Sequence, residues 1–345
     1  MISDNPPLFM TSVASLRGAL LRDGPDLRLE DFARAETILT EVLAEVRRQR
    51  NTRMPVDRLP PEMLARIFTC LAPRPDESNY SLAAQRDLCE PTNGAAPTLS
   101  LLTVTHVYSK WRAVALLTPS LWTRIASDRH PEELEAFLAR SKSMPITLCT
   151  RDSNLTSMQS TLKSIAYRLR RLDVITSSKC EAHEVLAQLD LQAPLLDCLT
   201  LELWQGDDLE QSRVHQQHLL SRGIDSPLKA LGLIVNDFYH WKQVGAYFPN
   251  LTHLDLRDCP SAYDWEELVG SMRSLLSRTP LLQYLHLAKI YNVPWSQPAA
   301  YPPIVLASLR ALLFSYTSTE IAFSLIKIME PDTLLARSGA CTARF

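Results

Sequence analysis

The stretch LTHLDL, residues 251–256, has leucine at its first and fourth positions and a further apolar residue at its sixth. The chain contains six copies of this pattern, at separations of 27, 32, 23, 31 and 27 residues. The leucines that open the copies are Leu169, Leu196, Leu228, Leu251, Leu282 and Leu309. Periods of this length are typical of repeat proteins in which each unit is one short strand and one helix. The pattern therefore predicts a parallel sheet with helices outside it.

Helical segments are expected between the strands, at residues 158–169, 182–191 and 263–278. In the last of these, Leu268, Met272 and Leu275 are spaced to face a sheet. In four copies a proline stands one or two residues before the first leucine and fixes the chain just ahead of the strand. We expect an irregular α/β solenoid over residues 127–345, with high mobility beyond Pro331 because no capping unit follows.

Residues 1–53 form a predicted N-terminal helical lead-in. Between residues 27 and 53 an apolar stripe that includes Phe32, Leu39 and Val46 recurs at helical spacing. We expect this helix to pair with a second helix over residues 12–21 and to pack on the next domain. A coiled-coil dimer is the alternative, but the stripe covers about two heptads where three or four are wanted.

The composition excludes several classes of protein. The 345 residues are 46% hydrophobic with a net charge of −2, which indicates a globular chain of more than one module and gives no case for nucleic-acid binding. No membrane span is expected because no run of 18 apolar residues occurs. The chain begins without a basic signal region, so an intracellular protein, cytoplasmic or nuclear, is expected. The seven cysteines are widely spaced without a C-x-x-C pair, and reduced thiols are predicted.

Catalytic and metal-binding patterns are weak or missing in the sequence. His215 and His218 have a spacing compatible with a metal, but no further ligand is close in the sequence, so a solvated helix face is favoured. The acidic run at 206–210 lacks the spacing of a calcium loop, and neither a G-x-S-x-G elbow nor a phosphate-binding loop occurs. We expect no enzyme, no cofactor and no metal.

Three blocks precede the repeats: LPPEMLARIF at 59–68, VYSKWRAVA at 107–115 and TPSLW at 118–122. Pro60 and Pro61 suit the start of a helix, and Glu62 then lies where the helix dipole favours an acid. The polar, proline-rich residues 73–98 between the first two blocks are expected to form a mobile loop. Two or three short helices packed together are predicted.

In this order the blocks resemble the F-box, and in particular the F-box-like proteins of mushroom-forming fungi, where a helical lead-in and a leucine-rich region flank it. The likeness covers nearly the whole chain, although Tyr108 stands where many members have cysteine and the insert at 73–98 is long. The resemblance implies a three-helix F-box module at 54–126 that docks on the Skp adaptor of a cullin-RING ubiquitin ligase. It also implies that residues 127–345, a leucine-rich-repeat-like region, bind a protein substrate.

The resemblance gives each set of residues an expected role. The candidates for facing the adaptor are Leu59, Pro60, Ile67, Phe68, Val107 and Leu121. The expected core residues of the module are Leu64, Trp111 and Trp122. The candidates for a target-binding rim, which follow the strands, are Trp204, Asp237, Tyr239, Arg257, Asp258 and Tyr291, with an ordinary solvated rim as the alternative.

A non-enzymatic substrate-recognition subunit, monomeric outside its complex, is the function that the resemblance implies. The alternative is a repeat scaffold or interaction protein whose F-box works outside ubiquitination.

Overall fold

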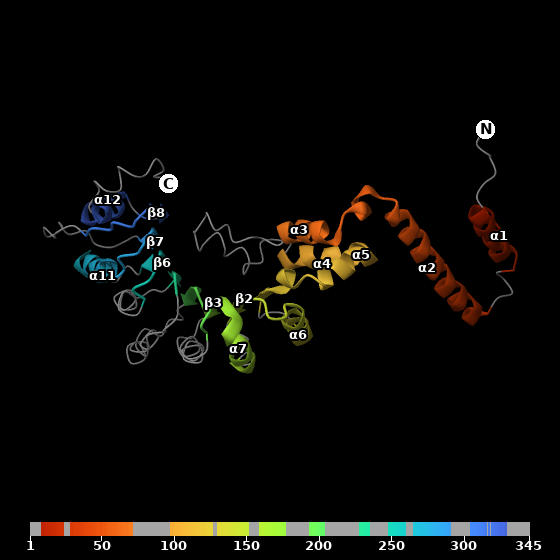
Figure 1. Ribbon diagram of the computed structural model, residues 1–345, viewed down its shortest axis with the longest axis horizontal. Helices are drawn as coiled ribbons and strands as arrows, with labels where there is room; N and C mark the ends of the chain where they lie inside the picture. The colour runs from red at the N-terminus through yellow and green to blue at the C-terminus, as the bar shows by residue number, and fades with distance from the viewer. Residues whose placement is uncertain are drawn as a thin grey trace, which may run out of the picture.

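The computed structural model describes residues 8–23, 28–71, 97–126, 130–151, 159–176, 193–203, 228–234, 248–259, 265–290, 304–315, 317 and 319–329. Within these ranges, two N-terminal helices lead to a cluster of short helices, and an eight-stranded parallel sheet follows (Figure 1). The strands lie in the sheet in the same order as in the chain. The protein is thus a mixed α/β protein with a parallel sheet, as the leucine pattern predicts.

The helical part precedes the sheet. Its elements are α1 (Leu8–Asp23), α2 (Leu29–Thr52), the 3-10 turn η2 (Pro55–Arg58), α3 (Pro61–Leu71), α4 (Pro97–Val107), α5 (Ser109–Leu116) and the 3-10 turn η4 (Pro119–Trp122). α3 begins at Pro61, where a missing N–H costs no helical hydrogen bond, and Glu62 lies at the positive end of the helix dipole. We call residues 55–122 the helical module. Figure 1 shows α2 extending away from this module.

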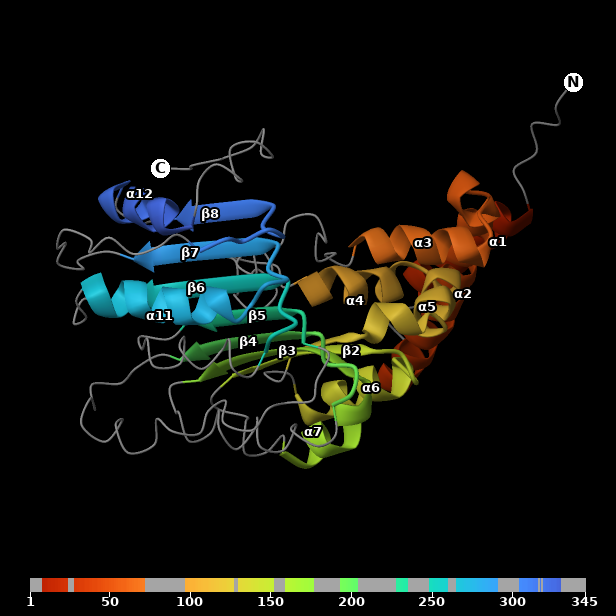
Figure 2. The ribbon, with the colours of Figure 1, turned by 60° about the vertical axis from the view of Figure 1, so that its left-hand side comes forward.

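The second part is the sheet with its connecting helices. The strands are β1 (Arg124–Ala126), β2 (Ile146–Arg151), β3 (Leu169–Thr176), β4 (Cys198–Leu203), β5 (Ala230–Ile234), β6 (His253–Cys259), β7 (Tyr284–Ile290) and β8 (Ala311–Ser315). The helices and turn between or after them are α6 (Pro131–Arg140), α7 (Gln159–Ile165), η6 (Ala166–Arg168), α11 (Trp265–Ser277) and α12 (Thr319–Ile328). The helices lie along one side of the sheet (Figures 1 and 2).

The register of the strands aligns the repeated leucines in rows across the sheet. One row contains residues that pair from β3 to β8: Leu172, Leu199, Leu231, Leu254, Leu285 and Leu312. The next row on the same face contains Val174, Leu201, Leu233, Leu256, Leu287 and Phe314. All but Leu312 and Phe314 are buried, and those two pack on the core from the last strand. The two rows form the apolar face of the sheet on which the helices pack.

The turns before the strands are joined by a second ladder of backbone hydrogen bonds. The amide of Asp197 donates to the carbonyl of Arg170 at 2.9 Å, and the amide of Thr252 donates to the carbonyl of Lys229 at 2.8 Å. Gln283 donates to Thr252 in the same way at 2.8 Å. The leucine that opens each copy is buried just before or at the start of its strand, so each unit is fixed to its neighbour by both backbone and side chain.

The helix α11 shows how the connecting helices cover the sheet. Leu268, Met272 and Leu275 are fully or almost fully buried, and they lie on the face that the spacing predicts. α12 buries Ile321, Leu325 and Ile328 in the same manner. Because the strands cannot cover their own leucine face, these two helices complete the core where they pack on it.

Three features of this fold correct the sequence-based predictions. The sheet begins at Arg124, ahead of the expected boundary at residue 127, and includes β1 and β2, which carry no copy of the leucine pattern. No residue of α2 is buried, so this helix is not packed on the next domain as expected. Cys149 on β2 is disulfide-bonded, contrary to the prediction of reduced thiols, whereas Cys70 and Cys198 are free.

Several predictions fall on residues outside the described ranges. These are the helix at 182–191, almost all of the insert at 73–98, the acidic run at 206–210, the pair His215 and His218, and the mobility expected beyond Pro331.

Candidate functional site

The core of the helical module is built by one face of α3. Leu64 and Phe68, which are four residues apart and so lie on the same side of the helix, are both buried. The ring of Phe68 packs against that of Trp111 on α5, with 5.3 Å between centroids and an angle of 57°. Trp111 itself is half-buried against this core. The module therefore has a small aromatic centre between α3 and α5.

Trp122 joins the helical module to the sheet. Its indole N–H donates a hydrogen bond to the carbonyl of Ala115 at 2.8 Å, which satisfies the polar atom of a fully buried side chain. Its ring meets Phe137 of α6 edge-on at 4.9 Å, and the guanidinium of Arg140 lies 4.5 Å from the ring centroid. Trp122 is thus surrounded by elements from both parts of the chain.

The segment that leads into α3 is held by a lysine. The Nζ of Lys110 on α5 donates to the backbone carbonyl of Asp57 and lies 3.3 Å from its Oδ1, and it reaches the carbonyl of Leu59 at 3.4 Å. Leu59 packs on the core as a half-buried residue. This contact fixes the start of α3, and with it the direction in which the other face of α3 points.

That other face carries exposed apolar side chains. Met63 and Ile67, one turn apart, are each 44% exposed, and Pro60 is exposed one turn before them. We call Pro60, Met63 and Ile67 the α3 stripe. Val107, at the end of α4, is 54% exposed. An apolar stripe beside a buried face on so short a helix is the arrangement expected of a helix that contacts both its own core and a partner.

Burial corrects part of the expected adaptor-facing set. Pro60, Ile67 and Val107 are exposed, and Leu59 is half-buried, but Phe68 and Leu121 are buried in the core of the chain. Phe68 shares the helix face of Leu64, and the tight turn η4 brings Leu121 into the core together with Trp122. These two residues are therefore not available to a partner.

Met63 is an exposed residue of α3 that the expected set lacks. Its position four residues before Ile67 is the signal that identifies it.

The face of the sheet opposite the leucine rows is polar. Because side chains alternate along a strand, the residues between the leucines point to this face. Its buried charged or titratable members, which define the polar face, are Arg171, Asp173, Cys198, Glu202, His253, Asp255, Arg257 and His286. Buried charge at this density requires partners, since an unpaired ion in the interior is strongly unfavourable.

Two arginine–aspartate pairs supply such partners. On β3 the Nε of Arg171 donates to Asp173 at 2.9 Å, and on β6 the Nη2 of Arg257 donates to Asp255 at 2.6 Å. In each pair the residues are two apart on one strand, and a second guanidinium nitrogen also donates to the carboxylate. Such two-pronged pairs are geometrically specific, so the polar face has a fixed arrangement of charge.

The β6 pair continues across β7 to β8. The Nδ1 of His286 lies 3.1 Å from Asp255, and its Nε2 lies 3.0 Å from the hydroxyl of Ser315. Burial alone would raise the pKa of Asp255, but hydrogen bonds from Arg257 and His286, together with their charges, lower it overall. The carboxylate is therefore held in its charged form.

Neighbouring groups are held in their neutral forms by burial. Burial lowers the pKa of His253 to about 4, and the imidazole stacks on Tyr284 with 4.5 Å between centroids. Burial also raises the pKa of the Cys198 thiol to about 12, with Arg171 acting in the opposite direction, so this thiol is unreactive at neutral pH. The polar face offers no nucleophile at these positions.

The structure describes only two of the six residues expected to form a target-binding rim, Arg257 and Asp258. Arg257 is 7% exposed and its guanidinium is hydrogen-bonded to Asp255. Its side chain therefore belongs to the polar face and not to an open rim. Asp258 lies on β6 directly after it. Trp204, Asp237, Tyr239 and Tyr291 lie outside the described residues.

Among the described residues, no group of three histidine, cysteine, aspartate or glutamate side chains is placed to hold a metal ion. None of the described helices combines the length and apolar character needed to cross a lipid bilayer. A comparison with known protein-family models finds no match, and neither does a comparison with curated protein sequences.

Proposed function

We propose that the helical module is an F-box that docks on the Skp adaptor of a cullin-RING ubiquitin ligase. The observation that carries the proposal is the α3 stripe, which exposes apolar side chains on a helix whose adjacent face already forms the core. Apolar groups in the centre of an interface supply most of its binding free energy. The order of the three sequence blocks, which resembles the F-box, adds to this observation.

We further propose that the sheet and its helices are a leucine-rich-repeat-like region that holds a protein substrate. The parallel strands follow one another in chain order, and described helices such as α11 and α12 lie between or after them, which is typical of such arrays. The chain would then act by positioning: it holds a target at a fixed distance from the ubiquitin-carrying enzyme and performs no chemistry itself. This is the role of a substrate-recognition subunit.

Co-expression of the full chain with the Skp adaptor, followed by gel filtration, tests the docking. The two proteins are expected to co-elute, and the double variant Met63→Asp/Ile67→Asp is expected to abolish co-elution while it keeps the thermal transition of the parent. The matched control is Phe323→Asp, an equally drastic change at a residue that is 63% exposed on α12. Co-elution that survives the double variant, or a parent chain that stays separate from the adaptor, contradicts the proposal.

Cullin recruitment separates a ligase subunit from a scaffold. When the chain and adaptor co-elute, added cullin is expected to join them in a pull-down. A complex that excludes the cullin contradicts the ligase role while leaving the docking intact.

A further inference from the structure

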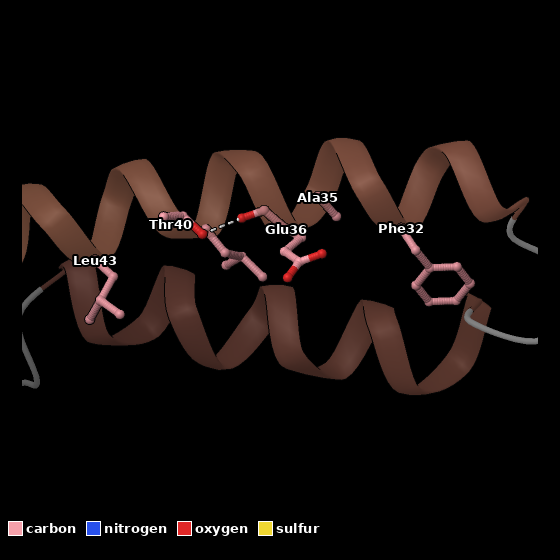
Figure 3. A pocket seen from close by; sticks show the side chains of 6 residues that line it. Phe32, Ala35, Glu36, Thr40 and Leu43 are labelled. Carbon is pink, nitrogen blue, oxygen red and sulfur yellow. Dashed lines mark hydrogen bonds between the residues drawn. The ribbon is translucent and has the colours of Figure 1, made fainter. Parts of the chain in front are cut away.

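The helix α2 carries an apolar stripe that nothing in the described chain buries. Phe32, Leu39 and Val46 lie seven residues apart, and Ala35 and Val42 fall between them, which is the spacing of a coiled-coil seam. The four large seam residues, Phe32, Leu39, Val42 and Val46, are 37–42% exposed, and no residue of this 24-residue helix is buried. A hollow of ≈ 490 Å³ runs beside the stripe, and Figure 3 shows Phe32 and Leu43 projecting from α2 there.

The stripe has the symmetry that self-association requires. Leu39 stands midway along it, with Phe32 seven residues before and Val46 seven residues after. A two-fold axis through this point sets the first half of one α2 against the second half of the other. In such an isologous contact each residue meets its counterpart reciprocally, so one patch on each copy completes the interface.

The charges of α2 favour an antiparallel arrangement. The first half of α2, residues 29–40, has a net charge of −2, from Glu30, Asp31, Arg34 and Glu36. The second half, residues 41–53, has a net charge of +2, from Glu41, Glu45, Arg47, Arg48, Arg50 and Arg53. Antiparallel pairing therefore places opposite charge together at both ends, whereas parallel pairing places like charge together.

We propose that the α2 stripe is covered by the α2 stripe of a second copy of this chain, in antiparallel orientation. Two heptads alone are short for a two-stranded coil. α1 adds exposed apolar residues at helical spacing, Met10, Val13 and Leu16, so the two copies together supply four helices to the contact. This dimer replaces the monomer expected from the sequence.

The dimer would carry two helical modules, one from each copy of the chain. Because α2 is separate from the α3 stripe, one copy's self-association leaves its docking face open. Two linked modules bind a partner with two sites more tightly than either does alone.

The mass of the purified full chain in solution tests the dimer. Sedimentation equilibrium is expected to give twice the monomer mass of 38.9 kDa. Leu39→Asp is expected to weaken self-association by a factor of at least ~100, since it places a charge in the centre of an apolar contact. Thr37→Asp, the same charge on the opposite side of the same helix, is the control and is expected to leave the dimer unchanged.

Charge exchange tests the orientation without disturbing the seam. Glu30→Lys/Glu36→Lys, or Arg47→Glu/Arg50→Glu, is expected to weaken the dimer about tenfold, because each makes both ends repulsive. The pairs leave in place the contact of Asp31 with the amide of Arg28 at 3.1 Å and that of Arg48 with Glu45 at 2.6 Å. The fourfold variant that combines both pairs is expected to restore the dimer.

Other results overturn the proposal. If another protein or another segment of the chain covers the stripe, the parent chain remains at 38.9 kDa. A dimer that Leu39→Asp leaves intact lies on a different surface. A dimer that is unaffected by either charge pair is not antiparallel through α2. Adaptor binding by Leu39→Asp is expected to match the parent, so failure here is distinct from failure of the proposed docking.

Discussion

Lys110 on α5 lies 3.3 Å from the carboxylate of Asp57, 53 residues earlier in the chain, and its ammonium also donates to the backbone carbonyls of Asp57 and Leu59. One side chain thus holds the turn η2 and the entry to α3. The position of the α3 stripe depends on this contact.

Replacement of Lys110 by methionine is expected to lower the free energy of unfolding by about 1 kcal/mol, since a charge-assisted hydrogen bond that is partly exposed contributes at the lower end of its range. Urea denaturation measures the change. Lys163→Met, at an exposed position on α7, is the control and should leave stability within ~0.5 kcal/mol of the parent. Under the proposed docking, we also expect Lys110→Met to lose affinity for the adaptor. Equal stability in both variants contradicts the role given to Lys110.

Trp122 offers a graded test of the junction between the helical module and the sheet. Trp122→Ala is expected to lower the free energy of unfolding by about 3–5 kcal/mol, because it opens a cavity beside Phe137. Trp122→Phe keeps a ring but leaves the carbonyl of Ala115 without its 2.8 Å donor, and should cost about 1–3 kcal/mol. Chemical denaturation of both variants should give this order. A Trp122→Phe protein as stable as the parent would show that the hydrogen bond contributes nothing, and equal losses in the two variants would show that the ring contact with Phe137 contributes nothing.

Asp255 makes the protein sensitive to acid. Its folded-state pKa is lowered, so its pairing stabilises the protein above the unfolded value of about 3.9, and this contribution is lost as pH falls through the lower folded-state value. Asp255→Asn is expected to lower the free energy of unfolding at pH 7 by about 3–5 kcal/mol, because Arg257 and His286 then lack a charged partner.

The comparison that checks this assignment is the stability of both proteins between pH 7 and pH 2. The variant should lose less further stability than the parent as acid is added. The double variant Asp255→Leu/Arg257→Met should recover part of the loss, since it removes both charges of the pair. Parallel pH curves for the parent and Asp255→Asn would rule out Asp255 as the source of acid sensitivity.

His253 is expected to affect stability at higher pH than Asp255. Burial lowers its pKa from 6.5 to about 4, so the unfolded chain takes up a proton first as pH falls. The contribution of the neutral imidazole is complete above pH 6.5 and is lost between pH 6.5 and about 4. His253→Phe, which keeps a ring on Tyr284, should flatten the stability curve in this window, and the exposed His106→Phe should not. An NMR titration that gives His253 an ordinary pKa contradicts the prediction.

The local features of the fold could be predicted from the sequence because they depend on short-range periodicity. The six leucine copies locate the strands β3 to β8, and the spacing of Leu268, Met272 and Leu275 identifies the buried face of α11. Proline at the start of α3 likewise marks its first residue. In each case a side chain's neighbours along the chain are enough to define the element.

The candidate site could be predicted only in part. Ile67 and Phe68 are adjacent and equally apolar, yet one is 44% exposed and the other is 1% exposed. Which of them is covered depends on where α5 packs, and apolar character alone carries no such information. The strands β1 and β2, which lack the leucine pattern, belong to the sheet only because they continue its parallel ladder.

The sequence by itself determined the strands β3 to β8 and the apolar face of helices such as α11, since hydrophobic periodicity acts over a few residues. Only the tertiary structure decided that Asp255 meets Arg257 and His286, with Ser315 completing the contact from β8. The physical reason is the register of a parallel sheet, which aligns residues about 30 positions apart and gives buried charges the partners they require.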